Sequence, residues 1–180
     1  MIYLFLADGF EEIEALAPLD ILRRAGKEVC TVGVTGGTVT GSHDIPIVCD
    51  ATVEDVDPDE TPEAVILPGG MPGTKHLDDN MFVCAFTKAV YKNGGFVCAI
   101  CAAPSVLGHI GVLAGKRATC FPGFEQELIG ADVTGDPVVR DGNVITAKGA
   151  GVALEFGFAI TEALCGAETA KKLSSSMQCR

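Results

Sequence analysis

The order of hydrophobic and polar positions predicts strands and helices that alternate along most of the chain. Short apolar runs ending at turn-forming residues are typical of buried strands, and longer runs with apolar positions three or four residues apart predict helices. Strands are expected at residues 2–7, 28–34, 64–67, 96–100 and 117–121, and helices at 10–25, 80–92, 103–113 and 152–164. Because strands joined through helices form βαβ units, the pattern indicates an α/β fold.

Three other segments complete this pattern. Residues 38–49 and 137–146 each hold two apolar runs around a turn and predict hairpins. Residues 50–62 are expected to form a connection or a short helix, and residues 174–180 a frayed end. A chain of 180 residues that is 48% hydrophobic can bury one sizeable core, so we expect a single domain over residues 1–180.

The net charge of the chain limits the classes of partner that it can bind. The sequence has 24 acidic and 13 basic residues, and its formal net charge of −11 repels phosphate backbones and anionic lipid surfaces. Neither a nucleic acid nor a membrane is expected as a partner. The first seven residues lack a basic segment and reach Asp8 and Gly9 too soon for a signal peptide or a spanning helix. A cytoplasmic protein is therefore expected.

Eight cysteines do not indicate a disulfide scaffold here, because such scaffolds belong to short secreted chains with small cores. Cys98 and Cys101 form a C-x-x-C motif. In a strand, however, residues three apart lie ~10 Å from each other and face opposite sides, too far for a disulfide or a shared metal. Most of the cysteines are expected to be reduced and structural, and no metal or cofactor is expected.

Cys101 is the candidate nucleophile. It follows the strand at 96–100 and precedes small residues and Pro104, which suits the first turn of a helix. A side chain on a tight turn from strand to helix projects above the carboxyl edge of a sheet, and the start of a helix stabilises a thiolate. The alternative interpretation is a small hydrophobic side chain that only fills space.

Glu14 is the candidate proton donor or acceptor. It falls within the apolar stripe of the helix at 10–25, together with Phe10, Ile13 and Ile21. A carboxyl on an apolar face is costly to ionise, which raises its pKa; alternatively, Glu14 snorkels or caps a local group. The same helix is apolar nearly all round, and we expect a symmetric homodimer to cover part of it.

Two backbone amides are candidate oxyanion donors. The strand at 64–67 ends at Pro68-Gly69-Gly70, and glycine lets the backbone approach a ligand closely. The amides of Gly70 and Ala102 are expected to lie beside the Cys101 sulfur, where they would hold a developing negative charge. A plain turn at residues 68–70 is the alternative.

Together these motifs resemble the ThiJ/PfpI superfamily and, within it, the DJ-one subgroup, over nearly the whole chain. The matching segments are ADGFEEIE at 7–14, RRAG at 23–26, VILPGG at 65–70, AICAAP at 99–104 and GAG at 149–151. The resemblance implies a flavodoxin-like three-layer sandwich with a mostly parallel central sheet and helices on both faces, and a homodimer. It also implies an oxidation-prone Cys101 that is hydrogen-bonded by a protonated Glu14, with Gly70 and Ala102 as oxyanion donors.

The chain departs from this resemblance at positions that bear on mechanism. Phe121 stands where some members carry a histidine, and Ala102 stands where the protease-like branch has one. Without an imidazole to protonate a leaving amine, peptidase activity is not expected. His43 stands near an arginine of relatives that lines an anionic pocket, so His43 and Arg24 are candidates for an anion pocket; the alternative for His43 is a solvated turn.

Two functions are compatible with these residues. In the first, Cys101 attacks reactive aldehydes such as methylglyoxal, a glyoxalase or protein deglycase activity in which Glu14 exchanges protons. In the second, the protein is an oxidative-stress sensor or redox-regulated chaperone in which Cys101 is oxidised to the sulfenic or sulfinic acid.

Overall fold

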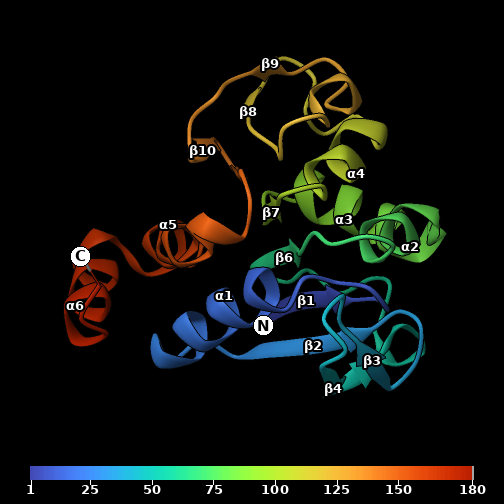
Figure 1. The fold of residues 1–180 in the computed structure, drawn as a ribbon, viewed down its shortest axis with the longest axis horizontal. Helices are drawn as coiled ribbons and strands as arrows, with labels where there is room; N and C mark the ends of the chain where they lie inside the picture. Colours follow the sequence, from blue (N-terminus) through green and yellow to red (C-terminus); the bar gives the residue numbers. More distant parts are fainter. Residues whose placement is uncertain (180) are drawn as a thin grey trace.

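A mostly parallel seven-stranded sheet forms the centre of the molecule (Figure 1). The computed structural model describes residues 1–179. From edge to edge the strands are β10 (Val138–Asp141), β11 (Val144–Ala147), β7 (Phe96–Ile100), β6 (Ala64–Leu67), β1 (Ile2–Leu6), β2 (Val29–Gly33) and β5 (Ala51–Thr52). Neighbouring strands are parallel except β10, which is antiparallel to β11. The order β2-β1-β6-β7-β11 is the flavodoxin-like order 2-1-3-4-5, which confirms the expected fold.

Helices cover both faces of this sheet, so the three layers are confirmed as well (Figure 1). One face carries α1 (Glu12–Arg24) and α5 (Ala153–Cys165), with α6 (Ala167–Ser176) packed outside α5. The other carries α2 (Gly73–Asp79), α3 (Met81–Lys92) and α4 (Pro104–His109). Short 3₁₀ helices span Val53–Asp55, Glu125–Glu127 and Ala150–Val152. None of the helices in residues 1–179 has both the length and the apolar character needed to cross a bilayer.

The side chains of β1 explain how the sheet joins two cores. Ile2, Leu4 and Leu6 pack into the cluster beneath α1 and α5, whereas Tyr3 and Phe5 pack into the cluster beneath α3. This alternation follows from the two-residue period of a strand. Because both faces are covered, the strand is continuously apolar, and this is the pattern from which a buried parallel strand was predicted.

The stripe expected for α1 is partly wrong. Ile13 was placed on the core face, yet its side chain is 57% exposed. The helix instead turns Ala15, Leu19 and Leu22 toward the sheet. Its neighbouring face packs against α5, so a second helix of the same chain covers part of the surface from which the homodimer was inferred. The homodimer stays a prediction.

Several other boundaries differ from the expected ones. Helix α2 lies in a segment for which no helix was predicted, and the strand expected at 117–121 shortens to β8 (Arg117–Ala118), which pairs with β9 (Asp132–Val133) outside the main sheet. The hairpin at 38–49 is confirmed by β3 (Thr38–Thr40) and β4 (Pro46–Val48).

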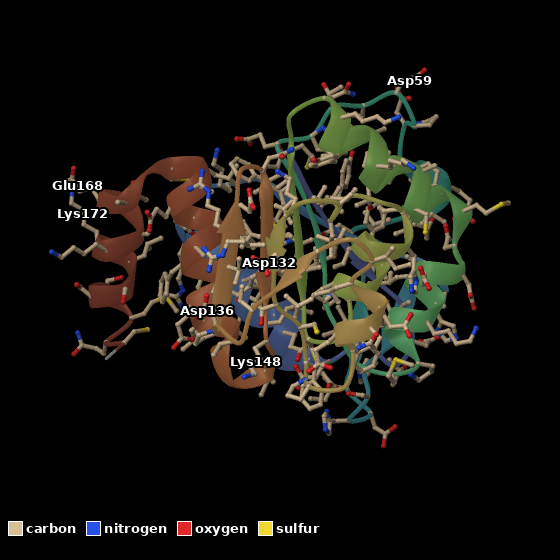
Figure 2. The ribbon with its side chains drawn as sticks, turned by 90° about the horizontal axis from the view of Figure 1, so that it is seen from above. Asp59, Asp132, Asp136, Lys148, Glu168 and Lys172 are labelled. Carbon is tan, nitrogen blue, oxygen red and sulfur yellow. The ribbon has the colours of Figure 1, made fainter. Side chains whose placement is uncertain are left out.

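The chain end expected to be frayed is helical as far as residue 176, and Arg180 lies outside the described residues. Helix α6 is stabilised by burial of Ala170 and carries the exposed pair Glu168–Lys172, 2.7 Å apart, on its outer side (Figure 2).

A glycine sets the approach of α5 to α1. A Cβ at Gly157 would lie 2.7 Å from Cδ1 of Ile21 and 3.0 Å from Cα of Pro18. Although alanine favours a helix over glycine by up to about 1 kcal/mol, overpacking costs about 1–3 kcal/mol. We expect Gly157→Ala to lower the free energy of unfolding by about 1–2 kcal/mol in urea denaturation. Ser175→Ala on the exposed part of α6 is the control, and a stabilised Gly157→Ala protein would contradict this packing.

Candidate active site

Three loops meet at the carboxyl ends of neighbouring parallel strands. Glu14 lies in the first turn of α1 after β1, Gly69 and Gly70 follow β6, and Cys101 follows β7. In the sheet, β2 lies on one side of β1 and β6 lies on the other side, so successive connections run in opposite directions from β1. The strand order reverses at this point, which is where open α/β sheets form a crevice. The fold therefore brings four sequence-predicted site residues to one place, because Ala102 adjoins Cys101.

Cys101 occupies a strained turn between β7 and α4. Its φ is +65°, in the left-handed region that non-glycine residues rarely adopt. Two backbone hydrogen bonds hold it there: the amide of Cys101 donates to the carbonyl of Ala147 at 2.9 Å, and the amide of Phe121 donates to the carbonyl of Cys101 at 2.8 Å. The side chain is half-buried. This is the geometry of a nucleophile elbow, as the sequence predicted.

Glu14 is almost fully buried against this elbow, with 1% of its surface exposed. Its carboxyl lies beside Cys101, and interactions with the Cys101 side chain and the amide of Ala150 lower its pKa in part. The amide of Gly69 donates to Oε2 at 2.9 Å. A Cβ at Gly69 would lie 2.5 Å from that oxygen and 2.6 Å from Cβ of Cys101, so the approach of Glu14 to Cys101 requires glycine between them.

Burial determines the charge of this pair. Burial raises the pKa of Glu14 from its usual 4.5 to about 7, although the bonds from Cys101 and Gly69 act in the opposite direction. Burial, followed by the charge of Glu14, raises the pKa of the Cys101 thiol to about 12. Burial therefore opposes a negative charge on either side chain of the pair. The thiolate beside a protonated Glu14 that the resemblance implies stays a prediction.

The amides of Gly70 and Ala102 lie close enough to the sulfur of Cys101 to lower its pKa in part. Gly70 has a φ of +89°, and a Cβ there would overlap the backbone of Glu11. Only glycine fits this position. The two predicted donors thus converge on the reacting atom, while their action on a substrate oxygen stays a prediction.

Two further donors to Glu14, the amides of Gly69 and Ala150, were not among the predicted site residues. Both lie in motifs that the sequence marked, residues 68–70 and 149–151. A glycine-containing motif indicates close backbone approach, but it does not say which amide faces a side chain from another element. That information arises only when β6, β11 and α1 are assembled.

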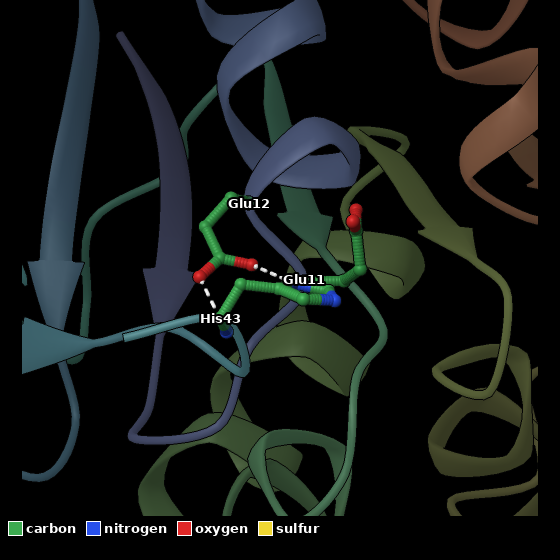
Figure 3. Close-up of side chains that lie close together, drawn as sticks. All are labelled: Glu11, Glu12 and His43. Carbon is green, nitrogen blue, oxygen red and sulfur yellow. Dashed lines mark hydrogen bonds and ion pairs between the residues drawn. The ribbon is translucent and has the colours of Figure 1, made fainter. Parts of the chain in front are cut away.

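Glu11, Glu12 and His43 form a second cluster at the start of α1 (Figure 3). One possible ligand atom from each lies within 4.8 Å of the others. The buried Glu12 carboxyl accepts from the amide of His43 at 2.7 Å and pairs with its Nδ1 at 2.8 Å. These bonds leave Nε2 of His43 and Glu11 as available ligands, fewer than the three or four of a zinc site. The cluster is therefore an ion pair, in which Glu12 raises the pKa of His43.

Arg24 and His43 do not meet within one chain, and an anion pocket that uses both stays a prediction. His43 contacts Glu12 at the first residue of α1, whereas Arg24 is the last, about 18 Å further along the helix axis. Nε of Arg24 donates instead to Asp20 at 2.7 Å.

Because residue 121 is a phenylalanine, this position supplies no imidazole to Glu14 and Cys101. The Phe121 side chain is 48% exposed beside the elbow. In residues 1–179, the ring nitrogens of the three histidines make their hydrogen bonds with groups other than Cys101 and Glu14. A thiol with one carboxyl and two amides can add to an electrophile and move a proton, but it lacks the second acid that expels an amine.

The fold and this site define a flavodoxin-like α/β protein with a cysteine on an elbow. The family model "DJ-1/PfpI family" matches residues 1–163. The protein dj-1beta of Drosophila melanogaster is 37% identical over 175 residues, 96% of this chain and 93% of that protein. A protein named deglycase from Pyrococcus abyssi is 35% identical over 145 residues, 79% of this chain and 86% of its own.

A solved structure is similar over nearly the full length. Toxoplasma gondii DJ-1, described as oxidized, superposes with a TM-score of 0.94 at 31% identity, covering 99% of this chain and 97% of that one. The chain belongs to the DJ-1/PfpI family.

The buried charge of Glu14 has a measurable effect on stability. Its pKa is raised in the folded state, so the protonated form stabilises the fold below about pH 4.5, and this contribution is lost as the pH rises through about 7. We expect Glu14→Gln to raise the free energy of unfolding by about 1–3 kcal/mol at pH 8 and to have little effect at pH 4.5. Urea denaturation at both pH values, with the exposed Glu162→Gln as control, checks this. An equal effect at both pH values would show that ionisation of Glu14 does not lower the free energy of unfolding.

Proposed function

We propose that the protein converts small reactive carbonyl compounds, with Cys101 as nucleophile and Glu14 as the group that moves protons. The observation that carries this proposal is the position of the buried Glu14 carboxyl beside Cys101 on its elbow, with only Gly69 between them. The relative named deglycase supports a reactive carbonyl as substrate. We infer a glyoxalase-type reaction on α-oxoaldehydes such as methylglyoxal.

The first step forms a hemithioacetal. Sulfur of Cys101 bonds to the aldehyde carbon, and the π electron pair of the C=O bond moves to oxygen. The thiol proton passes to Glu14 and from there to that oxygen. Because the Glu14 carboxyl lies beside Cys101 with only Gly69 between them, it is the group placed to relay this proton. The amides of Gly70 and Ala102 donate to the developing negative charge.

The remaining steps need no external oxidant. Glu14 takes the hydrogen of the former aldehyde carbon as a proton and returns it to the neighbouring carbon, while the hydroxyl proton moves to the second oxygen. The aldehyde carbon is thereby oxidised to a thioester, and the ketone carbon is reduced to an alcohol. Water then cleaves the C–S bond, which releases lactate and restores the thiol. The sum is methylglyoxal plus water giving lactic acid.

Both side chains are tested by substitution. We expect Cys101→Ser to reduce lactate formation to the background rate, and Glu14→Gln to lower kcat by about 10²–10⁴-fold because the proton acceptor is lost. In the wild type, kcat/KM should rise with pH through about 7, as Glu14 becomes ionised. Lactate released from methylglyoxal is measured by chromatography between pH 5 and 9.

Cys84→Ser is the matched control, since Cys84 is also a half-buried free cysteine but lies in α3. Full turnover by Cys101→Ser would exclude this function. A wild-type profile without a rise near pH 7 would leave the nucleophile in place and remove Glu14 as the base.

Redox sensing at Cys101 is a second candidate, favoured by the two amides at its sulfur and by the Toxoplasma gondii relative described as oxidized. Hydrogen peroxide would oxidise the thiol to the sulfenic acid, with release of water, and a second equivalent would give the sulfinic acid. The added oxygens would accept from Gly70 and Ala102.

Mild peroxide treatment followed by peptide mass spectrometry tests this candidate. We expect Cys101 to gain oxygen before the other seven cysteines, since its half-buried sulfur combines access with amide donors. Oxidation spread evenly over the eight cysteines would argue against a sensor.

A further inference from the structure

An open cavity of about 360 Å³ lies beside the elbow. It is lined by Phe121, Pro122, Lys148, Gly149, Ala150, Gly151 and Val152. The lining is apolar apart from Lys148, labelled in Figure 2, whose ammonium donates to the carbonyl of Gly135 at 3.4 Å. The mechanism proposed above uses none of the side chains in this lining.

Two segments that line the cavity contact the residues of the reacting pair, Cys101 and Glu14. On one wall, the amide of Phe121 donates to the carbonyl of Cys101 at 2.8 Å. On the other, the amide of Ala150 lies close enough to the carboxyl of Glu14 to lower its pKa in part. The cavity therefore adjoins the segments that hold both reacting side chains.

The cavity is larger than methylglyoxal needs. Apolar cavities of about 150 Å³ already hold benzene, so this one accepts an aryl ring, whereas a methyl group leaves most of it to water. Phe121 offers a ring that is 48% exposed. Aromatic rings pack edge-to-face or offset, and such contacts change binding about three- to tenfold. A glycine keeps this space open, because a Cβ at Gly149 would lie 3.3 Å from Cδ2 of Phe121.

We propose that this cavity binds the substituent of the substrate's ketone carbon, and that Phe121 makes the protein prefer α-oxoaldehydes with an aryl or branched apolar group over methylglyoxal. The proposal rests on the carbonyl chemistry proposed above and names the substrate class of that site. Phe121 acts on specificity through contact with the substituent.

The experiment compares kcat/KM for phenylglyoxal and methylglyoxal in each protein, because the ratio across variants cancels the intrinsic reactivity of the two aldehydes. We expect Phe121→Ala to lower the phenylglyoxal-to-methylglyoxal ratio about three- to tenfold. Gly149→Ala should lower it too, because the added methyl group narrows the cavity while Phe121 is kept. Ile129→Ala, whose side chain is 57% exposed outside the cavity, should leave the ratio unchanged. An unchanged ratio in Phe121→Ala and Gly149→Ala would overturn the proposal.

A second readout separates this inference from the function on which it rests. Mandelate and lactate are the products of the two aldehydes, and each is tested for protection of Cys101 against iodoacetamide in the wild type and in Phe121→Ala. Stronger protection by mandelate that is lost in Phe121→Ala supports the subsite even if neither aldehyde is turned over, in which case only the proposed function fails. Equal protection by mandelate and lactate would exclude the subsite even if both aldehydes are turned over. Circular dichroism establishes that each variant is folded.

Discussion

The close approach of Glu14 to Cys101 joins the start of the first helix to the end of a central strand, and the rest of the site depends on it. The two residues are far apart in the sequence, and they meet because β1, β6 and β7 are neighbouring parallel strands whose carboxyl ends share one edge. A carboxyl this deeply buried needs partners, and the amides of Gly69 and Ala150 supply them. The sheet thus determines not only where the pair lies but also how its charge is compensated.

The same close approach explains why glycine occurs at positions 69 and 70. At Gly69 a side chain would separate Glu14 from Cys101, and at Gly70 it would overlap the loop that leads into α1. The backbone strain at Cys101 accompanies the same arrangement, because a sharp turn brings the sulfur near two amides and a carboxyl together. This strained backbone lowers the stability of the fold while it sets the geometry of the site, as is common at functional sites.

The sequence was sufficient to predict the fold class and the convergence of Glu14, Gly70, Cys101 and Ala102, because strand ends and turn residues carry a local signal. It was insufficient where tertiary packing decides. Ile13 has the spacing of a core residue, yet the helix is rotated by its contacts with the sheet and α5. The distribution of charge between Glu14 and Cys101 also depends on burial, which no motif records. Likewise, the sequence pattern placed Arg24 and His43 in one pocket, but within the chain they lie at opposite ends of α1.

Residue 121 carries a phenyl ring instead of an imidazole, and this is consistent with the chemistry proposed for Glu14 and Cys101. Hydrolysis of a peptide requires a second acid to protonate the departing amine, and within residues 1–179 no histidine ring bonds to the pair. An α-oxoaldehyde has no amine to expel: its conversion moves one carbon-bound proton between adjacent carbons, and water completes it. A single buried carboxyl with a pKa near 7 can both accept and return that proton at neutral pH. The position that a histidine would occupy is then free to hold an apolar ring, for which we propose a role in binding instead of proton transfer.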